Sequence, residues 1–275
     1  MTTTLTTSDF DFVRELVRRQ SAIVLEPGKE YLVESRLLPL ARATKEGSIA
    51  SLVSTMRREP SGPLVSRVVD AMTTNETSFF RDVHPFDALA KHVLPELIRT
   101  RSAERRLSFW CGASSSGQEP YTISMVLREA LAASPGWQTS LLATDLSTDM
   151  LARTKAGRYS QLEVNRGLPV TMLVKHFDKV GTEWQVKPEL RSMVQTRALN
   201  LAVPFPAMGP FDVVFLRNVL IYFDTPTKKA VLDRVRRVLR PGGYLFLGGA
   251  ETTLTIDDAW ERVVLDRATA YRPRP

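Results

Sequence analysis

The chain has 275 residues, of which 43% are hydrophobic, 24% charged and 8% aromatic, a composition that excludes disordered and collagen-like proteins. No apolar run reaches the roughly 18–20 residues of a membrane-spanning helix, and the first residues lack the regions of a signal peptide, so we expect a cytoplasmic protein. The net charge of +7 is spread without a basic block, and one cysteine with three histidines is too few for a metal cage, so we expect neither nucleic acid nor a metal ion as a ligand.

The first quarter of the chain has a helical pattern throughout. Ser8 is the expected N-cap of the first helix, because acidic residues and a helically spaced apolar stripe follow it. On the second predicted helix, at about residues 29–44, we expect the Tyr31 side chain to face the core. The further predicted helices cover about 29–44, 48–58 and 62–72. We therefore predict an all-α N-terminal domain over residues 1–72.

From about residue 106, short apolar runs alternate with amphipathic stretches of helical length. This alternation is typical of βαβ units and a mostly parallel sheet. The expected strands are 106–111, 140–145, 211–216 and 244–247, with helices at 120–133, from 147, and at 226–239. A turn is expected at Pro241-Gly-Gly243, and two strand-like runs within 260–271 could add an antiparallel edge. The fold class predicted from this pattern is α/β.

An extra segment at about 157–196 interrupts the α/β pattern. Its two short alternating runs, 175–181 and 183–187, are joined by a Gly-Thr pair and predict a hairpin. We interpret the segment as a small antiparallel β subdomain inserted into the sheet domain. Insertions near the carboxyl edge of a parallel sheet commonly contact substrate.

A glycine-rich turn follows the first strand and opens a helix, between Gly112 and Gly117. Asp145 ends the second strand, where an acid can accept hydrogen bonds from both ribose hydroxyls; alternatively, it caps the helix that starts near Ser147. The turn matches neither a Walker loop nor a dinucleotide fingerprint. Because Glu119 would repel a pyrophosphate but not a sulfonium or amino group, the pattern favours S-adenosylmethionine over a dinucleotide.

Residues 73–82 place polar side chains, two aromatic rings and Arg81 in a segment without helical or strand periodicity. Such a segment is either a linker or a loop that covers a ligand. Arg81 could bind a carboxylate through two parallel hydrogen bonds.

Six motifs, in this order, resemble the CheR-type chemotaxis receptor methyltransferases, which are protein-glutamate O-methyltransferases. They cover nearly the whole chain and are Thr73–Arg81 (TTNETSFFR), Gly117–Tyr121 (GQEPY), Ala143–Asp145 (ATD), Asn200–Leu201, Phe211–Phe223 (FDVVFLRNVLIYF) and Leu239–Leu245 (LRPGGYL). The resemblance implies a Rossmann-like class I methyltransferase domain over 84–275 with the subdomain at 157–196 inserted. It also implies that the linker, 73–83, contributes to the cofactor site.

The resemblance further implies which residues contact S-adenosylmethionine. The cofactor-binding residues would be Asn75, Thr77, Arg81, Glu119, Asp145, Asn200, Leu201, Arg217 and Asn218. Asp145 would hold the ribose, and Asn200 and Leu201 would flank the adenine. Arg81 and Tyr222 would be the catalytic residues. Where the family usually has two glutamates before Pro-Tyr, this chain has Gln118 and Glu119, and we assign the role to Glu119.

The function implied by the resemblance is methylation of glutamates on the cytoplasmic helical bundle of methyl-accepting chemotaxis receptors, with S-adenosylhomocysteine as the product. Arg36, Arg42 and Lys45 form a candidate docking face for these acidic helices, although a solvated helix face explains them equally well. Some family members also bind a peptide at the receptor's C-terminus. Nothing in the sequence demands an oligomer, so we expect a monomer. A methyltransferase for small molecules or nucleic acid, or a non-catalytic cofactor sensor, remains an alternative.

Overall fold

The computed structural model describes residues 5–132 and 134–274, and the chain divides into two compact units. The smaller unit consists of Met1–Thr74 and Tyr222–Thr227, and the larger of Asn75–Ile221 and Lys228–Pro275. Within the two described ranges, no helix is both long enough and apolar enough to cross a membrane.

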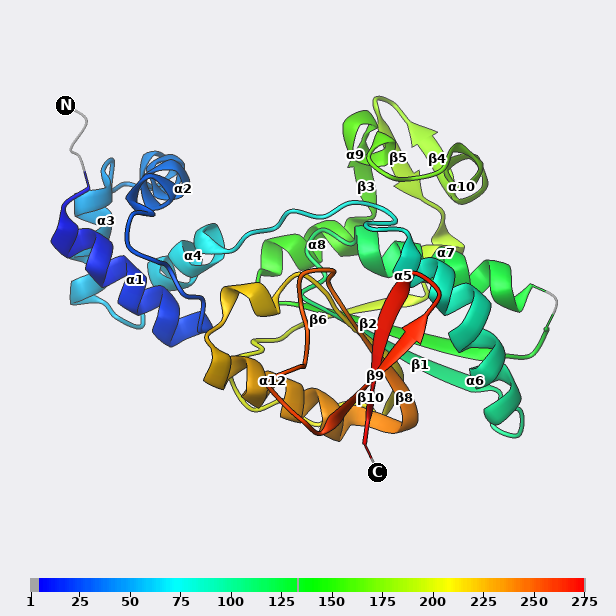
Figure 1. Cartoon of the computed structure of the whole chain (residues 1–275). Helices are drawn as coiled ribbons and strands as arrows, with labels where there is room; N and C mark the ends of the chain where they lie inside the picture. Colours follow the sequence, from blue (N-terminus) through cyan, green and yellow to red (C-terminus); the bar gives the residue numbers. More distant parts are fainter. Residues whose placement is uncertain (1–4, 133, 275) are drawn as a thin grey trace. The chain divides into compact units, whose positions relative to one another are not determined.

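The smaller unit is built from α-helices, as the sequence pattern predicts (Figure 1). Its helices are α1 (Thr7–Ser21), α2 (Glu30–Ala43), α3 (Ile49–Arg58) and α4 (Pro63–Met72). The four pack around one apolar core, in which Val13, Val33 and Leu52 are fully buried. The N-cap of α1 is Thr6 and not Ser8, because the Thr6 hydroxyl accepts a hydrogen bond from the backbone N–H of Asp9 at 3.1 Å.

Two side chains of α2 differ from the sequence-based expectation. Tyr31 is 63% exposed and does not face inward. Arg36 is half-buried, and its guanidinium donates hydrogen bonds to the carbonyl oxygens of Met72 at 2.6 Å and Thr73 at 2.9 Å. The end of a helix leaves carbonyl groups without intrahelical partners, and Arg36 binds them where α4 ends. Arg36 is therefore a structural clamp, and only Arg42 and Lys45 of the expected basic face are exposed.

The larger unit contains a seven-stranded sheet of order β6-β2-β1-β7-β8-β10-β9. The strands are β1 (Arg106–Gly112), β2 (Gln138–Asp145), β6 (Val194–Ala198), β7 (Phe211–Leu216), β8 (Leu239–Leu247), β9 (Trp260–Leu265) and β10 (Ala268–Pro273). Neighbours from β6 to β8 are parallel, whereas β10 is antiparallel to both β8 and β9. This confirms the Rossmann-like α/β class with an antiparallel edge.

Helices cover both sides of this sheet (Figure 1). They are α5 (His84–Ala88), η1 (Leu89–Val93), α6 (Leu94–Thr100), α7 (Gln118–Leu131), α8 (Thr148–Ala156) and α12 (Thr225–Val238), with the short 3₁₀ helix η2 at Leu220–Tyr222. Every residue of the central strand β7 is buried, because helices lie on both of its faces. The order of the strands reverses between β1 and β7, and open α/β sheets bind ligands at the carboxyl ends of strands that flank such a reversal.

The expected turn at Pro241–Gly243 is instead an irregularity within β8. Phe211 pairs with Leu239 and Val213 pairs with Tyr244, so the ladder between β7 and β8 shifts register across this segment. Strand pairing continues on either side, and the extra residues bulge outward as a β-bulge does.

A second, three-stranded antiparallel sheet interrupts the large one in sequence. It has the order β3-β5-β4, with β3 (Arg158–Ser160), β4 (Phe177–Val180) and β5 (Glu183–Val186), and the helices α9 (Gln161–Asn165), α10 (Val170–His176) and α11 (Pro188–Arg191) accompany it. This confirms the inserted antiparallel sheet, although the last residues of the expected 157–196 segment begin β6 of the large sheet. Phe79 and Tyr121 extend the core of the small sheet toward α7.

Candidate active site

The turn between β1 and α7 is held from two directions. The Tyr159 hydroxyl donates a hydrogen bond to the carbonyl of Ser116 at 2.8 Å, and the Thr154 hydroxyl donates one to the carbonyl of Ser115 at 3.0 Å. Gly117 adopts a φ of 99°, and a Cβ there would lie 2.8 Å from the Tyr159 oxygen. The small sheet, through Tyr159 of β3, thus helps to fix the turn that sequence analysis identified as the cofactor loop.

Asp145 ends β2 beside this turn and is 7% exposed. Its two carboxylate oxygens accept hydrogen bonds from the backbone N–H groups of Ser115 at 2.8 Å and Ser147 at 2.9 Å. Burial raises the pKa of Asp145, and the backbone donors that stabilise the anion oppose this. The N-cap of α8 is Ser147 itself, so Asp145 instead joins the loops that follow β1 and β2.

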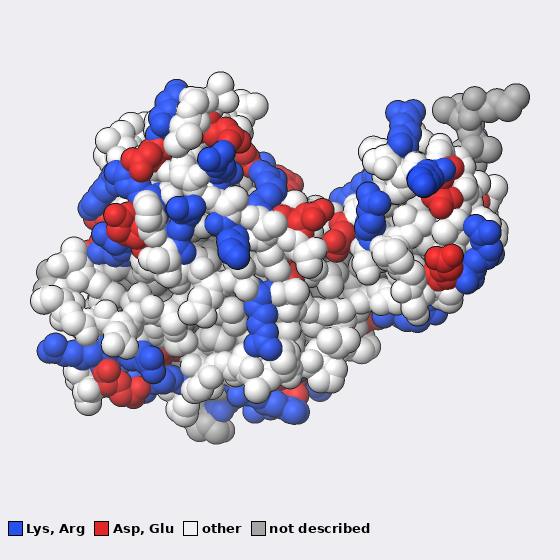
Figure 2. Space-filling model, turned by 180° about the vertical axis from the view of Figure 1, so that it is seen from behind, with Lys and Arg blue, Asp and Glu red and all other residues white. Residues whose placement is uncertain are grey.

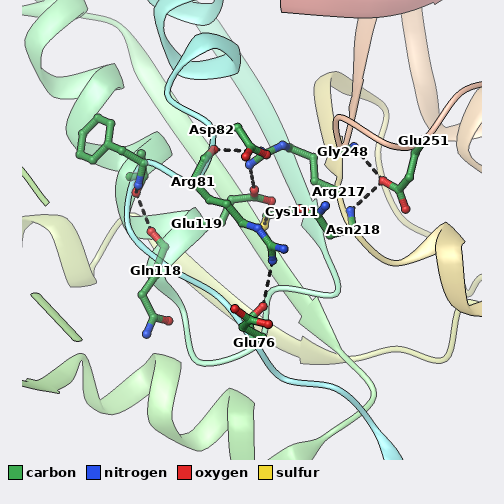
Figure 3. Close-up of polar contacts among 12 residues, drawn as sticks. Glu76, Arg81, Asp82, Cys111, Gln118, Glu119, Arg217, Asn218, Gly248 and Glu251 are labelled. Carbon is green, nitrogen blue, oxygen red and sulfur yellow. Dashed lines mark hydrogen bonds and ion pairs between the residues drawn. The ribbon is translucent and has the colours of Figure 1, made fainter. Parts of the chain in front are cut away.

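Arg217, directly after β7, is the central cation of the site, and its side chain is 1% exposed (Figure 3). Its guanidinium donates to Glu119 at 2.5 Å, to Asp82 at 2.6 Å and to the carbonyl of Arg81 at 2.9 Å. It also lies over the ring of Phe86, 5.4 Å from the centroid. Arg217 therefore joins the loop after β7 to the start of α7 and to the 73–83 segment.

Glu119 and Gln118 point in different directions (Figure 3). The Glu119 carboxylate binds Arg217 with one oxygen, and its other oxygen accepts a hydrogen bond from the buried Cys111 thiol at 3.3 Å. Burial raises the pKa of Cys111 well above its usual range, so this thiol stays protonated and can donate. Gln118 accepts from the Ser116 hydroxyl at 2.8 Å and makes no contact with Arg217 among the described residues.

The segment from Asn75 to Val83 is a structured loop. The Asn75 carbonyl accepts a hydrogen bond from the Ser115 hydroxyl at 2.8 Å, and the Phe80 N–H donates to the Thr122 hydroxyl at 3.1 Å. Arg81 donates to the carbonyl of Glu76 at 3.1 Å, and Thr77 is half-buried. Phe80, Asp82 and Val83 have φ values of 48°, 67° and 48°, which non-glycine residues seldom adopt. Its contacts with α7 and the glycine-rich turn fix the backbone around Arg81.

Two predicted adenine-flanking residues, Asn200 and Leu201, follow β6 at the same carboxyl edge. The Leu199 N–H donates to the main-chain carbonyl of Asp145 at 2.9 Å, which places this segment beside the end of β2. Asn200 accepts from the Ala202 N–H at 2.9 Å, and Leu201 is 7% exposed. The segment that carries Asn200 and Leu201 therefore lies beside Asp145, and their roles toward the adenine and the ribose stay predictions.

Sequence reasoning missed Glu251, which lies in the loop after β8 (Figure 3). Its carboxylate accepts hydrogen bonds from the backbone N–H groups of Asn218 at 2.7 Å, Gly248 at 2.7 Å and Ile221 at 3.3 Å. Asn218 has a φ of 57°. A Cβ on Gly248 would lie only 2.6 Å from the side-chain amide nitrogen of Asn218, Nδ2. Glu251 thus fixes the main chain at one predicted site position, Asn218, and also at Gly248 and Ile221, which are not among the predicted site residues. The sequence neighbours of Glu251 carry no motif that signals this.

Tyr222 ends η2 and groups with the smaller unit. Its carbonyl accepts a hydrogen bond from the N–H of Val24 at 2.9 Å. Its proximity to the transferred methyl group stays a prediction. Among residues 5–132 and 134–274, no group of three or more His, Cys, Asp or Glu residues could hold a metal ion.

The sequence is similar to known proteins over nearly its whole length. Residues 75–268 match the family model described as "CheR methyltransferase, SAM binding domain", and residues 8–73 match "CheR methyltransferase, all-alpha domain". The chain is 43% identical over 271 residues to chemotaxis protein methyltransferase 1 of Pseudomonas aeruginosa, covering 97% of this chain and 98% of the relative. It is 42% identical to chemotaxis protein methyltransferase Cher2 of Pseudomonas putida, with coverage of 97% and 98%.

A third relative, the chemotaxis protein methyltransferase of Vibrio parahaemolyticus, is 38% identical over 275 residues, which cover 98% of this chain and 99% of the relative. The family matches span both units and include the residues of the carboxyl-edge site. The chain belongs to the CheR methyltransferase family, whose larger domain binds S-adenosylmethionine.

Proposed function

We propose that the protein transfers a methyl group from S-adenosylmethionine to glutamate side chains of methyl-accepting chemotaxis receptors, which forms γ-methyl esters and serves sensory adaptation. The observation that carries the proposal is the pair of fixed carboxylates, Asp145 and Glu119, at the carboxyl edge of the sheet in a chain of this family. Each is held in place by hydrogen bonds from groups of this chain.

The chemistry of these residues fits S-adenosylmethionine. A carboxylate such as Asp145 can accept hydrogen bonds from the two ribose hydroxyls, and an anion such as Glu119 attracts an amino group. Gly112 permits a close approach between the cofactor turn and β7, because a Cβ there would lie 2.8 Å from Leu216 Cδ1. Asn75, Thr77, Arg81, Asn200, Leu201, Arg217 and Asn218 would complete the cofactor site.

Methyl transfer to a carboxylate needs little acid–base catalysis. When bound, S-adenosylmethionine supplies a methyl group on a positively charged sulfur. A glutamate oxygen of the acceptor, ionised at neutral pH with an ordinary pKa of about 4.3, forms the new bond to the methyl carbon. The electron pair of the carbon–sulfur bond returns to sulfur, and the neutral thioether of S-adenosylhomocysteine leaves, so no proton is transferred.

The protein's task in this reaction is placement. Arg81 can bind the entering carboxylate or the cofactor's own carboxylate, and its backbone is fixed through the bond from Arg217 to its carbonyl. Tyr222 would orient the acceptor through its hydroxyl group. Positioning of this kind lowers barriers by about 7–11 kcal/mol in ideal intramolecular reactions.

The proposed partner is the cytoplasmic helical bundle of the receptors, with the receptor's C-terminal peptide as a possible second contact. Arg42 and Lys45 are exposed on the smaller unit and can attract acidic helices, whereas Arg36 is engaged within its own unit. Titration calorimetry with a receptor C-terminal peptide would measure the second contact directly.

The deciding experiment is incorporation of tritiated methyl groups from S-adenosylmethionine into receptor-containing membranes. We expect label that mild base releases, because carboxyl methyl esters hydrolyse where N-methyl groups do not. Arg81→Ala should abolish incorporation while circular dichroism shows an intact fold. Base-stable label, or no label on receptors with the wild-type protein, would contradict the proposal.

A further inference from the structure

A cavity of about 520 Å³ lies in the larger unit at the carboxyl end of β8, beside the candidate active site. None of the predicted site residues lines it. Its lining includes Asp82, Glu251, Arg262, Arg267, Thr269 and Tyr271. Two of these residues also touch the site, since Asp82 binds Arg217 and Glu251 binds the backbone of Asn218.

The acids of this cavity are already engaged. Asp82 is paired with the buried Arg217 at 2.6 Å, and the Glu251 carboxylate accepts three backbone N–H groups. Within the described residues, no hydrogen bond or ion pair joins either carboxylate to the arginines of this cavity, Arg262 and Arg267.

The arginines of the cavity, Arg262 and Arg267, differ from its acids in how they are paired. Arg262 is exposed on β9, and among residues 5–132 and 134–274 it makes a single hydrogen bond, to the hydroxyl of Thr269 at 3.3 Å. Arg267 is exposed in the turn between β9 and β10, and within the described part of the chain it has no hydrogen-bond or ion-pair partner. Elsewhere on the larger unit basic side chains are commonly paired, as Arg153 is with Glu163 and Lys175 with Glu129, and Figure 2 shows Lys and Arg interspersed with Asp and Glu.

The antiparallel edge of the sheet explains why both arginines meet this cavity. Arg262 pairs with Tyr271 across the ladder, and Thr269 lies on the same face of β10 as Tyr271. The alternate residues Ala268 and Ala270 are buried in the core of the larger unit, beneath the helices that follow residue 84. The β9–β10 turn brings Arg267 to the carboxyl edge of the parallel strands.

We propose that this cavity binds an acidic segment of the methyl-accepting polypeptide, with Arg262 and Arg267 contacting carboxylates that flank the glutamate to be methylated. The inference rests on the proposed function. It adds a determinant of acceptor specificity that belongs to neither the cofactor contacts nor the smaller unit. Two arginines that pair with no carboxylate of the described residues match a substrate whose carboxylates recur along a helix.

The test measures methylation kinetics with purified receptor for three proteins: wild type, Arg262→Glu/Arg267→Glu, and the control Arg106→Glu. Arg106 is exposed at the opposite, amino-terminal end of β1. We expect the double variant to raise the receptor KM by on the order of tenfold or more, because reversal of each charge replaces attraction by repulsion. The kcat and the Kd for S-adenosylhomocysteine should stay near wild type, and added salt should narrow the difference in KM.

Each outcome is distinct. Wild-type activity with an unchanged KM in the double variant would overturn the docking role and leave the proposed function standing. A loss confined to kcat or to S-adenosylhomocysteine affinity would also overturn it, because the arginines would then act on the cofactor site. No receptor methylation by wild type would instead overturn the proposed function. Thermal melts of all three proteins verify folding, and Arg262→Gln/Arg267→Gln repeats the measurement without charge reversal.

Discussion

Two carboxylates, Asp145 at the end of β2 and Glu251 in the loop after β8, stabilise opposite halves of the carboxyl edge in the same way. Each accepts hydrogen bonds from backbone N–H groups of two loops, Asp145 from Ser115 and Ser147 and Glu251 from Asn218 and Gly248. Asp145 lies on the predicted cofactor side, whereas Glu251 borders the cavity that we assign to the acceptor. The comparison shows that one device, an acid that binds main-chain amides, can fix the geometry of either half of the site.

The buried Arg217 lies between the two halves, and its removal should have the largest effect. Arg217→Ala leaves Glu119 near the buried thiol of Cys111 without its counter-ion, so we expect the free energy of unfolding to fall by about 3–5 kcal/mol. Urea denaturation measures this. Arg237→Ala is the matched control, because the 72% exposed Arg237 pairs with Asp233 alone in the part of the chain that the structure describes, and its loss should change stability by about 0.5 kcal/mol or less. Equal losses of unfolding free energy in Arg217→Ala and Arg237→Ala would show that the buried Arg217 stabilises the fold no more than an exposed arginine does.

Asp145→Asn should distinguish the two halves of the site, because it should weaken the binding of S-adenosylhomocysteine, the ligand of the cofactor half. The amide keeps one carbonyl oxygen as an acceptor but places an N–H₂ group against a backbone donor, and the variant also loses the charge available to ribose hydroxyls. We expect S-adenosylhomocysteine affinity to fall by about 10- to 100-fold. Calorimetric titration measures it; a change of less than twofold would remove Asp145 from the cofactor site.

Glu251→Gln should affect the acceptor half of the site more than the cofactor half. The backbone of Asn218 and Gly248 would lose a charge-assisted acceptor, at a cost of about 1–3 kcal/mol in the unfolding free energy. Asn218 is one of nine predicted cofactor contacts, whereas Gly248 and Glu251 themselves line the acceptor cavity, so we expect kcat and receptor KM to worsen more than S-adenosylhomocysteine affinity. If the affinity for S-adenosylhomocysteine falls as far as in Asp145→Asn, the two carboxylates do not divide the site in this way.

The smallest expected effect concerns pH and lies outside the site. Burial lowers the pKa of His176, and its contact with Glu129 only partly opposes this. The unfolded chain therefore binds a proton at a higher pH than the folded chain, so the stability that neutral His176 contributes is present above the unfolded pKa of about 6.5 and declines as pH falls below it. Urea denaturation at pH 7.5 and 5.5 should show a smaller decline for His176→Asn than for wild type. An identical decline would mean that His176 does not contribute to the pH dependence.

Local patterns predicted the parts of the molecule that local physics determines. Apolar runs of strand length indicated β1, β2 and β7, and an acid at the end of β2 indicated Asp145, because both signals lie within a few residues. The Arg217–Asp82 pair could not be found in that way, since 135 residues separate its members. Glu251 likewise acts through main-chain amides, which carry no side-chain signal.

The smaller unit shows the same limit. Helical spacing placed Arg36 on an outward basic face, but the long side chain reaches the carbonyl groups at the end of α4, 36 residues away. Tyr31 is apolar enough to suggest the core, yet it lies in the first turn of α2 with 63% of its surface exposed. A periodicity argument gives the side of a helix that a residue occupies; the length of the side chain and the ends of neighbouring helices decide what it touches.

The buried position of Cys111 has a practical consequence. It is the chain's one cysteine, it is inaccessible to solvent, and burial keeps its thiol protonated and unreactive. A maleimide dye should therefore react with a cysteine introduced on the surface and leave the native one unlabelled. Pairs of such dyes, one on each unit, would allow fluorescence energy transfer to follow the distance between the units during catalysis, without any change to the native residues of the active site.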